Sequence, residues 1–172
     1  RRSFVEASRQ ATQALARRLA DEGHGDTVVV VGTLDRDADT PDDLGVPKGA
    51  PQNVAAVLHN GQVVAQYAKH HLPNYGVFDE ARYFTAADQP VVVDVAGVPV
   101  GIVICEDLWA WDGPAADAAA AGARVVASPN ASPYHRGKRP EREHWCAHHA
   151  TRDDTFLVYV NQVGGQDEVV FD

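Results

Sequence analysis

An uninterrupted β-branched run, TVVVVGT at residues 27–33, constrains the fold more than any other feature of the sequence. A strand with one solvated face alternates apolar and polar residues, so a continuous run indicates a strand covered on both faces. The residues before it place apolar side chains on one helical face, which predicts a helix over residues 3–22. Further short strands and helices follow, and we therefore expect a layered α/β domain.

The clearest local pattern is that of a β-hairpin. Residues 53–59 and 62–69 are strand-like runs on either side of Asn60-Gly61, the dipeptide that favours a type I′ turn. The hairpin would bring Lys69 to a strand end, and the loop of about twenty residues that follows has a length typical of functional loops. Elsewhere we expect a loop over residues 35–51, strands over residues 91–95, 98–105, 124–128, 156–162 and 168–171, and helices over residues 114–122 and 141–152.

Composition limits the classes of partner. With 172 residues, of which 45% are hydrophobic, the chain is expected to form one domain with a core of ordinary size. A net charge of −9 and a pI near 5.2 disfavour nucleic acids and anionic membranes, because the electrostatic term that drives such binding would be repulsive. No apolar run approaches the roughly 20 residues of a membrane span. We therefore predict no nucleic-acid partner and no membrane partner.

The two cysteines, Cys105 and Cys146, occupy different settings and form no disulfide framework, which favours a reducing, cytoplasmic location. Cys146 lies inside a predicted helix and is most simply a packed small residue. The sequence has no methionine and begins directly in a helical pattern, so we expect it to be an internal fragment of a longer chain.

Cys105 is the first candidate for chemistry. It ends the apolar run GIVIC where the chain turns polar, and such a position can hold a nucleophile rigidly yet exposed. By itself, a cysteine of this kind is more often buried and structural. Lys69 would favour its thiolate and stabilise the negative oxygen of a tetrahedral intermediate, provided the two side chains approach each other. Without such a partner, Lys69 would be a solvated lysine at a strand end.

The histidines raise the question of a metal site. His144, His148 and His149 share one helical stretch with an i, i+4 pair, and His70 and His71 are adjacent elsewhere. No cysteine or carboxylate set with defined ligand spacing accompanies them. We therefore predict that the chain binds no metal.

Four ordered segments resemble a known family: KHHLPNYGVFDEARYF, VICEDLW, NASPYHRGK and NQVGGQDEVVFD. They are similar to the nitrilase superfamily, and within it to the glutaminase domain of glutamine-dependent NAD synthetase. The resemblance runs from Lys69 to Asp172, and the preceding hairpin also fits the family. It implies an α-β-β-α sandwich of the nitrilase type, of which this chain would be an incomplete fragment.

The resemblance implies a role for several residues. Cys105 would be the nucleophile that attacks the glutamine side-chain amide, Lys69 the lysine of the catalytic triad, and Glu80 a second carboxylate that orders the site. Tyr75 would contact the substrate. Glu106 would engage the amino-acid end of glutamine, and its backbone N–H would contribute to the oxyanion hole.

Ser132 and Lys138 resemble the polar pair that binds the same zwitterionic end of glutamine. Without the family, Ser132 would be a turn serine and Lys138 a solvated lysine. Tyr75 would then be a loop-packing aromatic, and Glu80 a surface glutamate.

The general base of the family is a glutamate that ends an early strand, and no residue of this sequence matches it. Glu6 lies on the predicted helix and Asp107 follows the nucleophile in its turn, so neither is a credible substitute. General-base catalysis is typically worth roughly 10²–10⁴-fold in rate. We therefore expect these 172 residues alone to be nearly inactive.

The function implied by the resemblance is release of ammonia from L-glutamine through a cysteine thioester. The glutaminase domain would span residues 1–172, lack its first strand and its C-terminal end, and need no cofactor. A synthetase domain downstream in the same polypeptide would use the ammonia, with ATP and magnesium, to make NAD from nicotinate adenine dinucleotide. A homo-oligomer is expected. Two alternatives stay open: a stand-alone nitrilase-like amidase or carbamoylase, and a non-catalytic interaction domain of the same fold.

Overall fold

The computed structural model describes residues 2–37, 40 and 44–172. The chain divides into two compact units, Arg1–Gln89 and Pro90–Asp172, which are called unit 1 and unit 2 below. Each unit combines a β-sheet with helices, so the predicted layered α/β class is confirmed. Among the described residues, no helix is long and apolar enough to cross a membrane.

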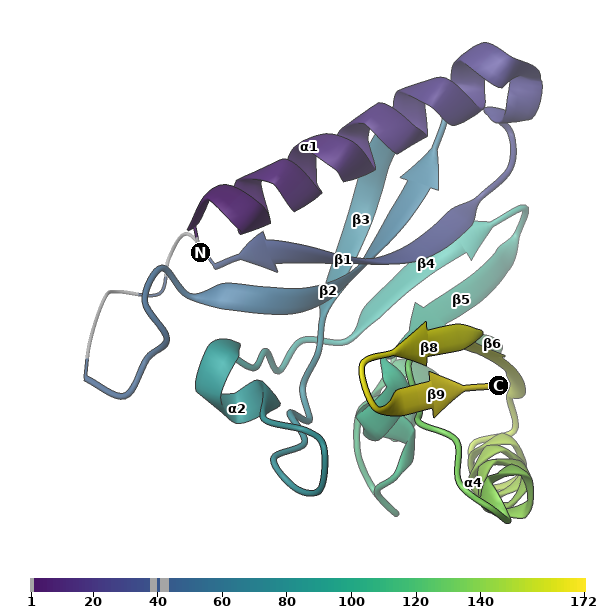
Figure 1. Ribbon diagram of the computed structural model, residues 1–172. Coiled ribbons are helices and arrows are strands. Elements are labelled where there is room, and N and C mark those ends of the chain that lie inside the picture. The colour runs from purple at the N-terminus through teal and green to yellow at the C-terminus, as the bar shows by residue number, and fades with distance from the viewer. Residues whose placement is uncertain (1, 38–39, 41–43) are drawn as a thin grey trace. The chain divides into compact units, whose positions relative to one another are not determined.

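Unit 1 is a three-stranded antiparallel sheet with one long helix packed along it (Figure 1). The strands β1 (Val29–Arg36), β2 (Pro51–His59) and β3 (Gln62–Ala68) lie in that order across the sheet. The helix α1 (Arg2–Leu19) contributes Ala16 to a core with side chains of β2. The partners of Ala16 in this core are Ala56, Leu58, Leu19, Val29, Val31 and Val63.

The predicted hairpin is confirmed. His59 pairs with Gln62, and the two residues between them, Asn60 and Gly61, have φ values of 49° and 76°. Positive φ at both central positions is the requirement of a type I′ turn. The predicted helix is confirmed as well; it ends in a π-helical turn, η1 (Ala20–His24).

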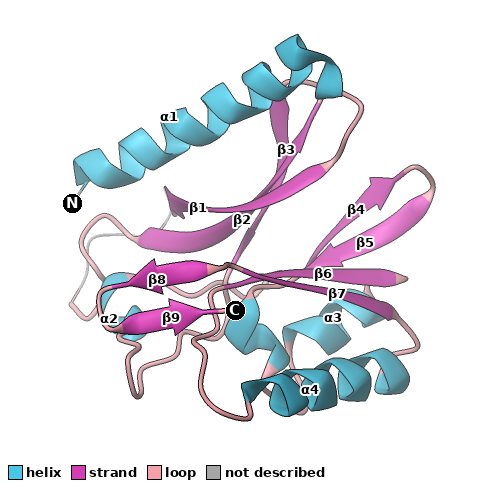
Figure 2. Ribbon diagram, turned by 45° about the vertical axis from the view of Figure 1, so that its right-hand side comes forward, coloured by secondary structure: helices cyan, strands magenta, loops and turns pink. Residues whose placement is uncertain are grey.

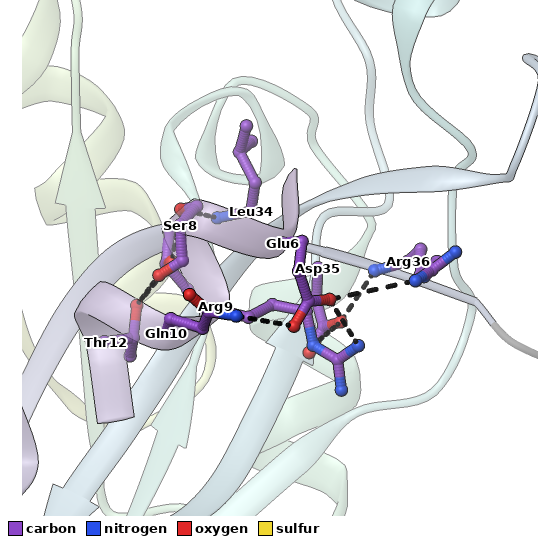
Figure 3. A network of polar contacts seen from close by, with 9 residues as sticks. Glu6, Ser8, Arg9, Gln10, Thr12, Leu34, Asp35 and Arg36 are labelled. Atoms are coloured by element: carbon purple, nitrogen blue, oxygen red, sulfur yellow. Dashed lines mark hydrogen bonds and ion pairs between the residues drawn. The ribbon is translucent and has the colours of Figure 1, made fainter. Parts of the chain in front are cut away.

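Polar side chains fasten α1 to β1 (Figure 3). The hydroxyls of Ser8 and Thr12 lie 3.0 and 2.6 Å from that of Thr33 on β1. Next to Ser8 on the helix, Arg9 forms an ion pair of 3.0 Å with Asp35. Directional contacts of this kind fix the helix on the sheet in one register, which apolar packing alone specifies less strictly.

Unit 2 is a four-stranded mixed sheet with the helices α3 (Pro114–Ala120) and α4 (Lys138–Arg152) on one face (Figure 2). The strands in spatial order are β4 (Val91–Val95), β5 (Val98–Ile102), β6 (Val125–Asn130) and β7 (Phe156–Asn161). β4 is antiparallel to β5, whereas β5, β6 and β7 are parallel. The core beneath this sheet consists of Val103, Leu108, Ala115 and Val126, with Trp109, Leu157 and Tyr159 packed against it.

Shorter elements complete the two units. They are α2 (Glu80–Tyr83), the 3₁₀ turn η2 (Cys105–Leu108), and the paired strands β8 (Gly164–Gln166) and β9 (Val169–Phe171). Several predicted boundaries were wrong, and two of them lie close to predicted site residues. The strand predicted to reach Cys105 ends at Ile102, because Cys105 already begins η2. The last helix starts before Pro140 rather than after it, since proline is tolerated in a first helical turn.

Candidate active site

Three parallel strands of unit 2 end on the same side of the sheet, and the predicted site segments follow them. β5 leads to Cys105, β6 leads to Ser132, and β7 ends at Asn161. Ligands of open α/β sheets bind outside the carboxyl ends of parallel strands. The topology therefore brings two predicted site residues, Cys105 and Ser132, to the edge where a ligand site is expected.

Cys105 has a strained backbone. Its φ of 46° lies in the left-handed region, which residues other than glycine seldom adopt. Strain of this kind costs about 1–3 kcal/mol and concentrates at functional sites. The residue stands where β5 gives way to η2, and a sharp, strained strand-to-helix turn is a recurrent way of presenting a nucleophile. Ala50, Asn60, Ala96, Asp154 and Asp167 also have positive φ, so the strained backbone agrees with the sequence motif at Cys105 but does not by itself distinguish this residue.

Hydrogen bonds among neighbouring residues stabilise the turn that carries Cys105. Asp107 is fully buried, and its Oδ2 accepts a hydrogen bond of 2.9 Å from the backbone N–H of Ile104. Glu106 is half-buried, and its carbonyl accepts a bond of 2.9 Å from Trp109 N. The Asp107 carboxylate therefore stabilises the turn, which fits a structural role better than that of a catalytic base.

Ser132 is 3% exposed, and both its backbone N–H and its backbone carbonyl form hydrogen bonds with side chains. Its N–H donates to Asn161 Oδ1 at 2.8 Å. Its carbonyl accepts from Asn161 Nδ2 at 3.0 Å and from Arg142 Nη2 at 2.8 Å. Sequence reasoning missed both Asn161 and Arg142.

Lys138 is not the solvated lysine that its sequence position alone suggests. Its side chain is 14% exposed, and Nζ lies 3.8 Å from the centre of the Trp109 ring. Nζ also donates to Glu141 Oε2 at 3.2 Å, and this hydrogen bond is the main reason that the pKa of Glu141 is lowered. Because Trp109 directly follows η2, the start of α4 lies beside the turn that carries Cys105.

Unit 1 holds Lys69 and Glu80 as a largely buried ion pair. Lys69 Nζ donates to both carboxylate oxygens of Glu80, at 2.8 and 2.9 Å, and the two side chains are 2% and 17% exposed. Asn53 on β2 contacts both partners: its Nδ2 lies 3.4 Å from Glu80 Oε2, and its carbonyl accepts from Lys69 N at 2.9 Å. The plain interpretations of a solvated lysine and a surface glutamate do not hold, and Asn53 is a further contact that the sequence did not reveal.

Tyr75 is 59% exposed in the loop between Lys69 and α2. Its ring makes an edge-to-face contact with Phe78, with ring centres 5.8 Å apart. Cys105 belongs to unit 2, whereas Lys69, Tyr75 and Glu80 belong to unit 1. The approach of Lys69 to Cys105 therefore stays a prediction.

The histidines of α4 pack with tryptophans. The His148 ring meets that of Trp111 edge-on, with centres 4.5 Å apart. His149 is fully buried, its Nε2 lies 2.9 Å from the Leu108 carbonyl, and burial lowers its pKa. Burial also raises the pKa of the Cys146 thiol on the same helix. Within residues 2–37, 40 and 44–172, no three His, Cys, Asp or Glu side chains are grouped so as to hold a metal ion.

Comparison with known families classifies the chain. The carbon-nitrogen hydrolase family model matches residues 3–171, and the chain therefore belongs to the carbon-nitrogen hydrolase family. Among its relatives, the glutamine-dependent NAD(+) synthetase of Xylella fastidiosa is 45% identical over 162 residues, which are 93% of this chain and 28% of that protein. The protein of the same name from Thermotoga maritima is 37% identical over 173 residues, which are 100% of this chain and 28% of the relative.

Solved structures agree with this assignment. The glutamine-dependent NAD+ synthetase of Acinetobacter baumannii, in complex with ADP, matches with a TM-score of 0.81 and 36% identity over 96% of this chain and 29% of that one. An amidase of Nesterenkonia AN1 from the nitrilase superfamily matches with a TM-score of 0.77 over 98% of this chain and 58% of that one, at 22% identity. The predicted nitrilase-type fold is thereby confirmed.

Proposed function

We propose that this chain is a glutaminase domain, which hydrolyses the side-chain amide of L-glutamine and releases ammonia. The observation that carries the proposal is the strained left-handed backbone of Cys105 at the carboxyl end of β5, in a member of the carbon-nitrogen hydrolase family. The names of its relatives support glutamine as the substrate. The chain spans 28% of the Xylella relative, so the activity of a whole synthetase is part of the proposal.

The proposed chemistry is nucleophilic catalysis by Cys105. Its thiolate attacks the amide carbon, and the resulting oxyanion is stabilised by the Lys69 ammonium and the backbone N–H of Glu106. The carbon–nitrogen bond then breaks, and the nitrogen takes up a proton and leaves as ammonia. Water attacks the γ-glutamyl thioester, which releases glutamate and returns the thiol. The proton acceptor for the thiol and the water is the family's glutamate, which no residue of this sequence matches.

The remaining site residues are proposed to bind and orient. Lys138 supplies a positive charge for the α-carboxylate of glutamine, and Glu106 an acceptor for the α-ammonium group. Ser132 adds a hydroxyl at the same end, and the exposed Tyr75 ring covers the substrate. Glu80 holds the Lys69 ammonium in place through the two hydrogen bonds that join them.

The ammonia would serve a synthetase domain of the same polypeptide, which converts nicotinate adenine dinucleotide to NAD. That step would use ATP and magnesium, whereas we propose no cofactor for amide hydrolysis itself. A homo-oligomer stays a prediction of the resemblance, and a cytoplasmic location stays a prediction from the two cysteines.

The test compares nitrogen sources in the complete gene product. Wild type and the Cys105→Ala variant are assayed for NAD formation from nicotinate adenine dinucleotide and ATP, with either L-glutamine or ammonium as nitrogen donor. We expect the variant to lose the glutamine-dependent reaction and keep the ammonium-dependent one, which also shows that it folds. If the wild type forms NAD from neither donor, the proposal fails and a stand-alone amidase or an inert domain takes its place.

A further inference from the structure

Ser132 lies in a segment without regular secondary structure, between β6 and α4, yet it is almost completely buried. A loop residue that serves a ligand must be held in place by its surroundings, because a free loop would lose conformational entropy on binding. The groups that hold Ser132 are Asn161, Arg142 and Asp172, which are called the Ser132 clamp below.

Asn161 is the centre of the clamp. Its side-chain amide bonds to Ser132 on both sides, accepting from the N–H at 2.8 Å and donating to the carbonyl at 3.0 Å. This reciprocal pattern resembles a residue pair in a β-ladder, with the side chain in place of a second backbone. Nδ2 also donates to the Asp172 carbonyl at 2.9 Å, which fixes the rotation of the amide group.

Arg142 closes the clamp from α4. Its guanidinium donates from Nη2 to the Ser132 carbonyl at 2.8 Å and from Nη1 to Asp172 Oδ1 at 2.7 Å. The Arg142 side chain is 11% exposed, so its charge-assisted bond to the buried Ser132 carbonyl forms with little competition from water, whereas the Asp172 side chain is 46% exposed. The planar guanidinium fixes the directions of both hydrogen bonds at once, which a lysine ammonium at this position could not do.

The chain on either side of Ser132 is fixed as well. Before it, Asn130 is paired with Asn161 in the β6–β7 ladder. After it, Tyr134 N donates to Val170 O of β9 at 2.8 Å. The Ser132 segment is therefore held at three successive points along the chain, and the clamp acts at the middle one.

We propose that Asn161 and Arg142 are positioning residues for glutamine, which act through Ser132 and set the affinity of the site. The inference rests on the proposed function, because it assumes that Ser132 binds the amino-acid end of the substrate. A displaced Ser132 would weaken the bound state while the thiolate and its partners stay in place. The effect then appears in KM rather than in kcat.

The kinetic test uses the complete gene product with the variants Asn161→Leu, Asn161→Asp and Arg142→Lys. Ammonia release from glutamine gives KM and kcat. Asn161→Leu removes all bonds of the amide, and we expect KM to rise roughly tenfold or more with kcat changed less than about threefold. Asn161→Asp retains an acceptor for Ser132 N–H, and Arg142→Lys retains the charge, so both should show smaller increases in KM. Gln162→Ala, at the next, exposed position, is the matched control and should leave KM unchanged.

Hydrogen–deuterium exchange tests whether Asn161 holds Ser132, separately from whether Ser132 binds glutamine. Because the Ser132 amide donates to Asn161 Oδ1, its exchange should accelerate in Asn161→Leu and stay at the wild-type rate in Gln162→Ala. Unchanged exchange in Asn161→Leu overturns the clamp, whatever the activity. Faster exchange with an unchanged KM overturns the positioning role but leaves the proposed glutaminase function unaffected. A wild-type protein that releases no ammonia from glutamine refutes the proposed function itself.

Discussion

Lys69 donates hydrogen bonds to both carboxylate oxygens of Glu80, at 2.8 and 2.9 Å, from a side chain that is 2% exposed. Glu80→Gln would leave this ammonium buried without a counter-charge, which typically costs roughly 3–5 kcal/mol. Because Glu80 is partly exposed, we expect a loss of about 3 kcal/mol in the free energy of unfolding, measured by urea denaturation. The double variant Lys69→Met/Glu80→Leu removes both charges and should recover most of it. A Glu80→Gln variant as stable as wild type would contradict the buried pair.

Gly101 permits the close packing of α3 on β5. A Cβ at this position would lie 2.7 Å from Ala118 Cβ and 3.0 Å from Ala123 Cβ. Gly101→Ala should therefore lower the melting temperature, with a cost of about 1–3 kcal/mol from overpacking. The second substitution Ala118→Gly opens space, and the double variant should be more stable than Gly101→Ala alone. If the double variant is no better, the close contact is not the cause.

The two thiols should differ in reactivity. Burial raises the pKa of Cys146, so little of its reactive thiolate exists at neutral pH. We expect iodoacetamide to modify wild type in a fast phase that Cys105→Ala abolishes and Cys146→Ala leaves intact, followed by mass spectrometry of the two peptides. A fast phase that survives in Cys105→Ala would show that Cys105 is not the reactive thiol.

His149 should make stability depend on pH. Burial is the main cause that lowers its pKa from 6.5, and the nearby Arg152 charge acts in the same direction. As the pH falls below about 6.5, the unfolded chain takes up this proton before the folded one does, so the free energy of unfolding must decrease. His149→Gln can still donate to the Leu108 carbonyl but cannot titrate. Its stability should decline less than that of wild type between pH 7 and 5, and equal slopes would contradict the assignment.

Tyr159 carries a buried hydroxyl that makes no hydrogen bond of ordinary geometry with a described residue, and its contact with Ser132 offsets only part of the effect of burial on its pKa. Burial raises the pKa of Tyr159 to about 12, so the group stays protonated at neutral pH. Since a buried hydroxyl without a hydrogen bond of ordinary geometry is unfavourable, Tyr159→Phe should leave the free energy of unfolding unchanged or raise it by about 1 kcal/mol. A clear loss of stability would show that the hydroxyl does have a partner.

The local parts of the fold were predictable from the sequence, and the long-range parts were not. Asn60-Gly61 predicts its hairpin because the turn depends on the backbone preferences of two adjacent residues. Burial on both faces was expected of residues 27–33, of which residues 29–33 lie in β1. It is instead β2 that buries five consecutive residues, 54–58, because β2 is the central strand of the described sheet. Strand order is a property of the whole sheet and leaves little trace in one run of residues.

In the site, too, the local features were predictable from the sequence and the long-range contacts were not. The motif around Cys105 pointed to a nucleophile, and the backbone of that residue is unusual in a way that agrees. The burial of Lys69 and Lys138 could not be read from their sequence positions, since it depends on Glu80 and on Trp109. The Ser132 clamp joins residues that are far apart in the chain. An asparagine at the end of the apolar run of residues 156–160 was the one signal that could have suggested it.

Cys105 is expected to carry the γ-glutamyl group during turnover, and mass spectrometry of protein quenched during the reaction can detect this intermediate. The complete gene product is mixed with L-glutamine, quenched in acid during steady-state turnover, digested, and analysed by mass spectrometry. We expect a peptide containing Cys105 that is heavier by one γ-glutamyl group and is absent from the Cys105→Ala variant. Ammonia release without this adduct, or an adduct on Cys146 instead, would contradict it.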